Sequence, residues 1–334
     1  MMDEAAVTFA RVSVVGAGAW GTALANVAAR AGHDVRLWGR NDAAMAALAL
    51  SRETARLPGV KIEPRVAPTS DLAVAAQCDL LLCVVPAQNT REMLRQLAPV
   101  LSPTVPVVLC SKGIERGTHK FMNEVLRDEL PRNPAAVLSG PSFAADVSRG
   151  LPTAVTLAAE REDLARQIAA AISAPSFRLY HSDDLTGVEI GGAAKNVLAI
   201  ACGIAAGRGL GASAGAALVA RGFAELSRFG RAFGARPETL MGLSGLGDLV
   251  LTCGSTQSRN FSFGVALGQG KTPQEASQTG LAEGAYTAPV LVEIAMEKGV
   301  DMPISRAVAG IVAGQLKVDE AVEALLARPA KAEG

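Results

Sequence analysis

Val12-Ser13-Val14-Val15-Gly16-Ala17-Gly18-Ala19-Trp20-Gly21-Thr22-Ala23-Leu24-Ala25 is the stretch that decides the fold. A β-branched run is followed by glycines spaced G-x-G-x-x-G and then by a helical pattern. In this order Gly16 permits a tight turn, Gly18 lets the backbone approach a pyrophosphate, and Gly21 lets helix and strand pack closely. An ordinary turn is the alternative, but the flanking strand and helix favour a dinucleotide-binding site.

The residues around this segment alternate short β-branched runs with helical patterns, which is typical of a parallel sheet built from βαβ units. We expect buried strands at Arg11–Val15, Val35–Trp38, Asp79–Val85, Val105–Cys110 and Ala136–Ser139. Two later runs, Ala154–Leu157 and Phe177–Tyr180, could extend the same sheet.

The pattern changes at about Thr186, where long Ala/Leu/Gly stretches with helical spacing begin, as in Val188–Ala206 and Ala214–Phe229. A chain of 334 residues is too long for one typical core. We therefore predict an α/β nucleotide-binding domain, a doubly wound parallel sheet, over residues 1–186. An all-helical domain over residues 187–334 would supply the catalytic and substrate-binding residues.

Composition excludes several classes of function. Lys+Arg and Asp+Glu both number 32, so the chain has no basic surplus for nucleic acid or a membrane surface, and we expect a small-molecule ligand. The acidic start does not resemble a secretory signal, which favours a cytoplasmic location. Lys195, Asn196 and Arg208 interrupt the longest apolar tract, residues 193–220, so we expect no membrane insertion.

The cysteines and histidines point to neither disulfides nor a metal site. Five single cysteines lie in mostly apolar surroundings without a C-x-x-C pair, which favours buried, reduced thiols. The histidines, His33, His119 and His181, are far apart in the sequence and lack the spacing of metal ligands. We predict no metal.

The end of the second strand, Leu37-Trp38-Gly39-Arg40, bears on the choice of cofactor. NAD-specific sites place an acidic residue near this point to bind the ribose 2′-hydroxyl, and none is present here. The Arg40 guanidinium could instead pair with a 2′-phosphate and stack on adenine. This favours NADPH, with NADH accepted; the alternative is a solvated surface arginine.

Other strand ends carry candidate ligand-binding residues, because ligands of doubly wound sheets bind outside the carboxyl ends of the strands. Ser111-Lys112-Gly113 and Ser139-Gly140-Pro141-Ser142 follow two predicted strands. Lys112 could bind a substrate anion or face the nicotinamide, and its alternative is a surface lysine.

Two polar islands stand out in the helical half. Lys195 enters the apolar stretch Gly191–Ile200, where a buried charge costs several kcal/mol unless a partner or function holds it. Carbonyl reduction needs a proton donor, and a desolvated lysine can donate near neutral pH. The alternative is a lysine whose amine reaches water. Asp248, in a glycine-rich apolar loop, could be the partner of Lys195.

Ser258-Arg259-Asn260 follows this loop and offers a hydroxyl, a guanidinium and an amide, a set suited to a phosphate. By itself this triplet is also an ordinary polar turn.

Taken together and in this order, these motifs resemble the bacterial NAD(P)-dependent glycerol-3-phosphate dehydrogenases, from Val12 to about Pro303. The segments that carry the resemblance are residues 16–25, 37–40, 111–113, 139–144, 192–197, 245–253, 257–260 and 282–284. The resemblance implies reversible hydride transfer between NAD(P)H and dihydroxyacetone phosphate, giving sn-glycerol 3-phosphate for phospholipid synthesis. It also implies a Rossmann-like domain followed by a helical domain like that of 6-phosphogluconate dehydrogenases, and a homodimer.

The resemblance also assigns roles to individual positions. Lys195 matches the proton donor and acceptor, with Asp248 in support. The positions that hold the substrate match Lys112, Gly140, Ser142, Lys195, Asp248, Ser258, Arg259 and Asn260. The positions that line the cofactor match Gly16, Gly18, Trp20, Gly21, Arg40, Lys112, Ala144, Arg259, Leu281 and Glu283. Ala19 and Leu281 stand where some relatives have Ser and Val.

Two other readings stay open from the sequence. One is a related two-domain dehydrogenase that acts on a hydroxyacid or a sugar phosphate. The placement of Asp248 and Arg259-Asn260 suits a small phosphorylated carbonyl compound better than a carboxylate alone. The other is a non-catalytic NADP-binding sensor, since a fold does not fix a function. Buried charges at Lys195 and Asp248 argue against a sensor.

Overall fold

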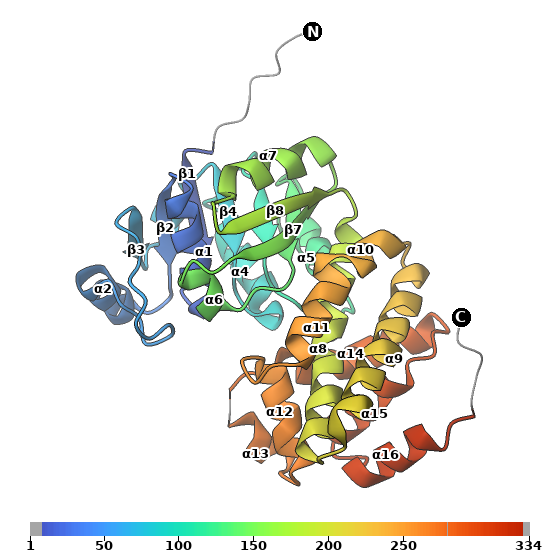
Figure 1. Ribbon diagram of the computed structural model, residues 1–334. Coiled ribbons are helices and arrows are strands. Elements are labelled where there is room, and N and C mark those ends of the chain that lie inside the picture. Colours follow the sequence, from blue (N-terminus) through green and yellow to red (C-terminus); the bar gives the residue numbers. More distant parts are fainter. Residues whose placement is uncertain (1–8, 279, 330–334) are drawn as a thin grey trace. The chain divides into compact units, whose positions relative to one another are not determined.

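The computed structural model describes residues 9–278 and 280–329. The chain divides into two compact units (Figure 1): Met1–Glu115 with Lys120–Glu189, and Arg116–His119 with Ile190–Gly334. The short segment Arg116–His119 thus belongs to the second unit although the chain on both sides of it belongs to the first, which the sequence did not indicate. The domain boundary at 186/187 stays a prediction.

The first unit is built on an eight-stranded sheet in the order β3-β2-β1-β4-β5-β6-β7-β8. The strands are β1 (Arg11–Val15), β2 (Asp34–Trp38), β3 (Val66–Thr69), β4 (Leu80–Cys83), β5 (Val107–Leu109), β6 (Ala135–Ser139), β7 (Thr153–Ala159) and β8 (Phe177–Ser182). All neighbouring pairs are parallel except β6 and β7. In this register Val14 lies opposite Leu37 on one side and Leu82 on the other.

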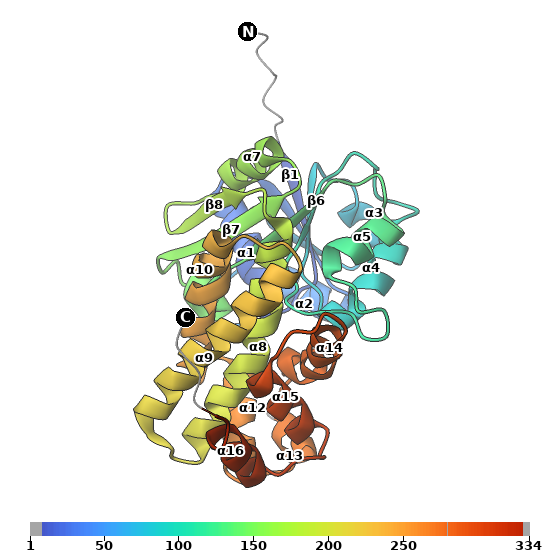
Figure 2. The same cartoon turned by 90° about the vertical axis from the view of Figure 1, so that its right-hand side faces the viewer.

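Helices cover both faces of this sheet, as Figure 2 shows for α4 and α5 on one side and α1 and α7 on the other. The helices of this unit are α1 (Ala19–Arg30), α2 (Asp42–Ser51), α3 (Leu72–Ala75), η1 (Ala87–Asn89), α4 (Thr90–Leu97), α5 (Met122–Glu129), α6 (Ala144–Ser148) and α7 (Glu162–Ile172). A hydrophobic core lies on each face of the sheet, and alternate residues of β4 point into one or the other. Leu82 packs with the α1 and α7 side chains, and Leu81 packs with those of α4 and α5. The doubly wound sheet is confirmed.

One strand was missed and two were predicted too long. β3 escaped notice because it has four residues and contains Pro68; a proline is tolerated there because β3 is an edge strand. Asp79 and Val105 are outside β4 and β5, which are shorter than the apolar runs that contain them. The two later runs, β7 and β8, do extend the sheet.

The second unit is helical. Its elements are α8 (Leu185–Gly207, which begins in the first unit), α9 (Gly211–Ala232), α10 (Pro237–Met241), η2 (Leu243–Gly247), α11 (Asp248–Cys253), α12 (Arg259–Gly268), α13 (Pro273–Ser277), α14 (Glu283–Glu297), α15 (Pro303–Val312) and α16 (Val318–Leu326). Both helices predicted here lie inside α8 and α9. Within the described part of the chain, α8 is the one helix long and apolar enough to cross a membrane, and 89% of its apolar window is buried, as in a core helix.

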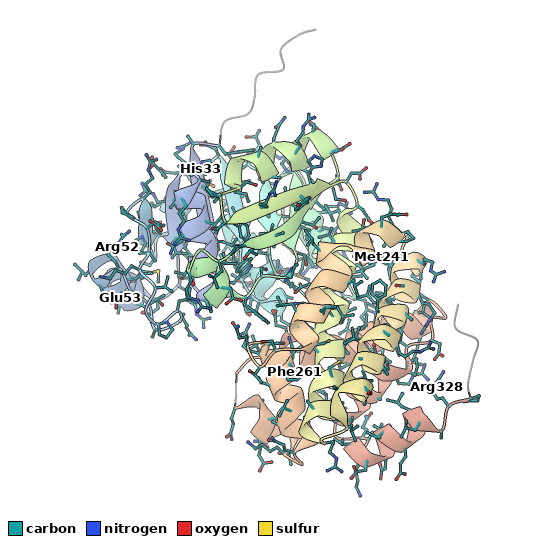
Figure 3. All side chains as sticks on the ribbon, viewed as in Figure 1. His33, Arg52, Glu53, Met241, Phe261 and Arg328 are labelled. Atoms are coloured by element: carbon teal, nitrogen blue, oxygen red, sulfur yellow. The ribbon has the colours of Figure 1, made fainter. Side chains whose placement is uncertain are left out.

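Glycines let α8 and α12 approach until their backbones touch. A Cβ atom on Gly203 would lie 2.1 Å from the carbonyl oxygen of Phe261, which Figure 3 labels on α12. A Cβ on Gly264 would in turn lie 2.2 Å from the carbonyl oxygen of Ile200. This contact fixes the start of α12, which carries Arg259 and Asn260, against the helix that carries Lys195.

Candidate active site

The glycine motif forms a turn between β1 and α1 in which Gly16 and Gly21 cannot be larger residues. Gly16 has φ +118°, and a Cβ there would lie 2.5 Å from the carbonyl oxygen of Val84. A Cβ on Gly21 would lie 1.8 Å from the Gly16 carbonyl oxygen, so α1 is pressed onto the turn. Among the described residues, no atom comes within 4 Å of a Cβ placed on Gly18. The side of Gly18 where a Cβ would stand is therefore open, which would let a pyrophosphate approach the backbone.

Three other predicted cofactor residues of the first unit lie after strands of the sheet or at the start of the helices that follow them. Arg40 is exposed just after β2, and its guanidinium makes no hydrogen bond or ion pair with any described residue. Trp20 is half-buried at the start of α1, with its ring centroid 6.4 Å from that of Phe177. Ala144 is the first residue of α6. The residues present fit a dinucleotide, and Arg40 is available to a 2′-phosphate.

Lys112, Gly140 and Ser142 lie together after β5 and β6. The Lys112 Nζ and the Ser142 hydroxyl both donate to the carbonyl oxygen of Gly140, each at 3.0 Å. Gly140 has φ +146°, and a Cβ there would lie 2.9 Å from the Val155 Cα on β7, so only glycine can make this turn. The predicted trio is thus one cluster, in which Lys112 is half-buried and its ammonium group is held by the Gly140 carbonyl.

The second unit joins Lys195 and Asp248 as the sequence suggested. The Lys195 Nζ lies 2.6 Å from Asp248 Oδ1, and the two side chains are 7% and 1% exposed. The Lys195 Nζ also donates to the Thr252 Oγ1 at 2.7 Å, and Thr252 Oγ1 lies 3.3 Å from Asp248 Oδ1. The carboxylate and the hydroxyl hold the Lys195 ammonium in a fixed position. An ammonium group held in this way can donate a proton, and the resulting amine can take it back.

Thr252 was missed, although a signal for it was present. Asp248 and Thr252 are four residues apart on α11, so they share a face of the helix. The π-helical turn η2 directly precedes Asp248, and such wide turns are frequent at functional sites. Its Gly245 lies against Leu240, where a Cβ would be 1.9 Å from a carbonyl oxygen. Close packing at Gly245 therefore fixes the position of the turn that precedes α11, and with it the position of Asp248 at the start of that helix.

Asn260 is locked in place by two neighbours. Its Nδ2 donates to Asn196 Oδ1 at 2.9 Å, and its Oδ1 accepts from the Gly284 N–H at 2.9 Å. Gly284 belongs to the first turn of α14, next to Glu283. Asn196, the neighbour of Lys195, was not among the predicted site residues, yet it orients one of them.

Three further predicted residues lie around this network in the second unit. The Ser258 hydroxyl caps α12 by accepting from the Phe261 N–H at 3.2 Å. Arg259 is exposed, and its Cδ would lie 3.7 Å from a Cβ on Gly280. Leu281 is 39% exposed, just before α14. Ser258 is thus a helix cap in addition to being a predicted substrate-binding residue.

No group of three or more His, Cys, Asp or Glu side chains is placed to hold a metal ion within residues 9–278 and 280–329. The prediction that the protein needs no metal stays a prediction.

Comparison with known proteins gives one consistent result. The family described as NAD-dependent glycerol-3-phosphate dehydrogenase matches with its N-terminal part over residues 11–165 and with its C-terminal part over residues 184–323. Proteins named glycerol-3-phosphate dehydrogenase [NAD(P)+] from Azorhizobium caulinodans and a Bradyrhizobium species are 63% and 61% identical, each over 97% of this chain and 99% of the relative. The crystal structure of the Coxiella burnetii glycerol-3-phosphate dehydrogenase is 38% identical, with a TM-score of 0.91, over 96% of this chain and 99% of that one.

Proposed function

Because the chain belongs to the NAD-dependent glycerol-3-phosphate dehydrogenase family, we propose that it transfers a hydride reversibly between NAD(P)H and dihydroxyacetone phosphate, giving sn-glycerol 3-phosphate. The enzyme is an oxidoreductase with a nicotinamide cofactor and a small-molecule substrate. Its product would supply glycerophospholipid synthesis.

The observation that carries this proposal is the buried contact between Lys195 Nζ and Asp248 Oδ1 at 2.6 Å. Reduction of a ketone leaves negative charge on its oxygen, which must be neutralised by a proton. The Lys195 ammonium supplies that proton and takes it back in the reverse direction. Asp248 and Thr252 hold the ammonium at one position. Because the group is buried away from water, its electrostatic interaction with a developing negative charge is stronger than it would be in solvent.

The remaining polar residues would hold the two ligands. The nicotinamide cofactor, when bound, supplies or accepts the hydride. We assign cofactor binding to Gly16, Gly18, Trp20, Gly21, Arg40, Lys112, Ala144, Arg259, Leu281 and Glu283. We assign substrate binding to Lys112, Gly140, Ser142, Lys195, Asp248, Ser258, Arg259 and Asn260. The cations Lys112 and Arg259 suit the phosphate of the substrate.

Three finer points belong to the same proposal. The absence of an acid at the end of β2 and the exposed Arg40 support a preference for NADPH over NADH. The family resemblance supports a homodimer and a cytoplasmic location. Light scattering of the purified protein tests the dimer directly.

The deciding experiment is to measure oxidation of NADPH, and separately of NADH, by the purified protein offered dihydroxyacetone phosphate. Unphosphorylated dihydroxyacetone is the control. We expect rapid oxidation only with the phosphorylated ketone. Binding of NADPH without any oxidation would reject this substrate and direct attention to other hydroxyacid or sugar-phosphate dehydrogenases.

A further inference from the structure

Glu189 is a buried acid outside the residues assigned to the reaction. It lies in the first turns of α8, and only 8% of its surface is exposed. Its Oε1 accepts from the backbone N–H of Asn123 at 2.9 Å, in the first turn of α5. The carboxyl group therefore fastens the start of one helix to the start of another.

Two acceptor atoms at this contact lack a donor. Among the described residues, Glu189 Oε2 and Asn123 Oδ1 are buried and have no hydrogen-bond partner. The two residues already share the bond from the Asn123 N–H to Glu189 Oε1, so both unpaired oxygens belong to one contact. A buried polar atom without a hydrogen-bond partner destabilises the folded state, because it has given up its bonds to water. A proton on Glu189 Oε2 would turn one of these two acceptors into a donor.

The surroundings of Glu189 favour the neutral acid. The pKa of Glu189 is raised from 4.5 to about 8, chiefly by burial and also by the Glu124 carboxylate on α5; the N–H groups of Asn123 and Met122 and the Arg127 charge lower it. Arg127 is not a dedicated counter-ion, because its guanidinium is paired with Glu160. Within residues 9–278 and 280–329, no salt bridge joins Glu189 to a cation.

We propose that Glu189 is held as a neutral carboxylic acid whose Oε2 hydroxyl donates to Asn123 Oδ1, so that one proton fastens α8 to α5. The folded chain then binds this proton more tightly than the unfolded chain does. Its contribution to stability is complete below about pH 4.5, the ordinary pKa, and declines as the pH rises towards about 8. Ionisation leaves a buried carboxylate near Glu124.

The contact has a consequence for the reaction, which rests on the proposed function. Lys195 is on the same helix, one to two turns beyond Glu189. Loosening the start of α8 would shift the Lys195 ammonium, and a displacement of about 1 Å can cost on the order of 100-fold in rate. Glu189 is a positioning residue, since it touches no reacting atom.

Glu189→Gln tests the proposal, because glutamine reproduces the neutral acid: its carbonyl can accept from the Asn123 N–H and its amide can donate to Asn123 Oδ1. We would measure unfolding by urea from about pH 5 to about pH 9. We expect the variant to match the wild type near pH 5, to exceed it near pH 9, and to lose the part of the pH dependence that Glu189 causes.

Glu225→Gln is the matched control. Both oxygens of this buried carboxyl already accept hydrogen bonds, Oε1 from the Ile304 N–H at 2.6 Å and Oε2 from the Ser305 N–H and hydroxyl at 3.1 and 2.9 Å. An amide nitrogen cannot accept these bonds, so this variant should be less stable than the wild type throughout. Equal destabilisation of Glu189→Gln near pH 5 would overturn the proposal.

A second measurement follows the carboxyl group itself. In protein labelled with ¹³C at the glutamate carboxyls, the signal that is missing from Glu189→Gln belongs to Glu189 and should titrate near pH 8 in the wild type. If that signal titrates in the ordinary range of a glutamate, Glu189 is ionised and the proposal fails. For the rate, kcat should fall in Glu189→Ala and be restored in Glu189→Gln, with the KM for NADPH unchanged. An unchanged kcat in Glu189→Ala overturns the positioning role, whereas turnover that survives Lys195→Ala contradicts the proposed function instead.

Discussion

At the scale of single residues, Lys195 is our proposed proton donor, and its ammonium is buried and held by Asp248 and Thr252. Lys195→Ala should reduce kcat by about 10²–10⁴-fold, the usual contribution of a general acid, and leave NADPH binding near that of the wild type. It should also lower the free energy of unfolding by roughly 3–5 kcal/mol, since Asp248 loses its partner. Steady-state kinetics, cofactor titration and denaturation measure these effects.

The control for this variant is Lys271→Ala, which removes an exposed lysine of the same unit. It should change neither kcat nor stability appreciably. If Lys195→Ala keeps most of its turnover, another group donates the proton.

Arg40 decides the choice of cofactor if its guanidinium meets the 2′-phosphate. Arg40→Asp should weaken NADPH binding far more than NADH binding, because it replaces an attractive charge with a repulsive one. Fluorescence titration with each cofactor measures both affinities. Arg36→Asp, the same change at an exposed position within β2, should affect the two cofactors alike. An equal loss of both affinities in Arg40→Asp would make Arg40 a scaffold residue.

At the scale of elements, the contact between α8 and α12 depends on glycine. Gly203→Ala would place a methyl 2.1 Å from the Phe261 carbonyl oxygen and should destabilise the protein by about 1–3 kcal/mol, as overpacking usually does. Gly215→Ala, inside α9, meets no atom of the described residues within 4 Å and should stabilise by about 0.5–1 kcal/mol. Urea denaturation compares the two, and a stable Gly203→Ala would show that the helices can separate at no cost.

At the scale of the whole molecule, all five cysteines are buried and free, as expected for reduced thiols. Burial raises the pKa of Cys78 to about 11 and of Cys83 to about 12, which further suppresses the reactive thiolate. A thiol reagent such as Ellman's should therefore react slowly with the native enzyme and with five thiols after unfolding. Leu50→Cys, at a position 87% exposed, supplies one fast-reacting thiol as a positive control. Fast reaction of the native wild type would show that a buried segment opens readily.

The sequence by itself determined the features that depend on neighbouring residues. The strand, turn and helix of residues 12–25 could be predicted because their pattern is local; a Cβ on Gly21, for example, would meet the carbonyl oxygen of Gly16 in the same turn. The alternation of strands and helices followed from periodicity, and so did the change to a helical second half. β3 was missed because four residues with a proline carry too little local pattern.

The tertiary structure decided which distant residues meet. Lys195 and Asp248 are 53 residues apart. The sequence suggested this pair because each is a charge in an apolar segment, but only the tertiary structure brings the two groups into contact. Three other features were even less evident from the sequence: the contact of Thr252 with Lys195, the link from Asn196 through Asn260 to α14, and the contact between Glu189 and Asn123. Such contacts are set by how helices pack, because packing brings side chains together at distances that no pattern along the chain encodes.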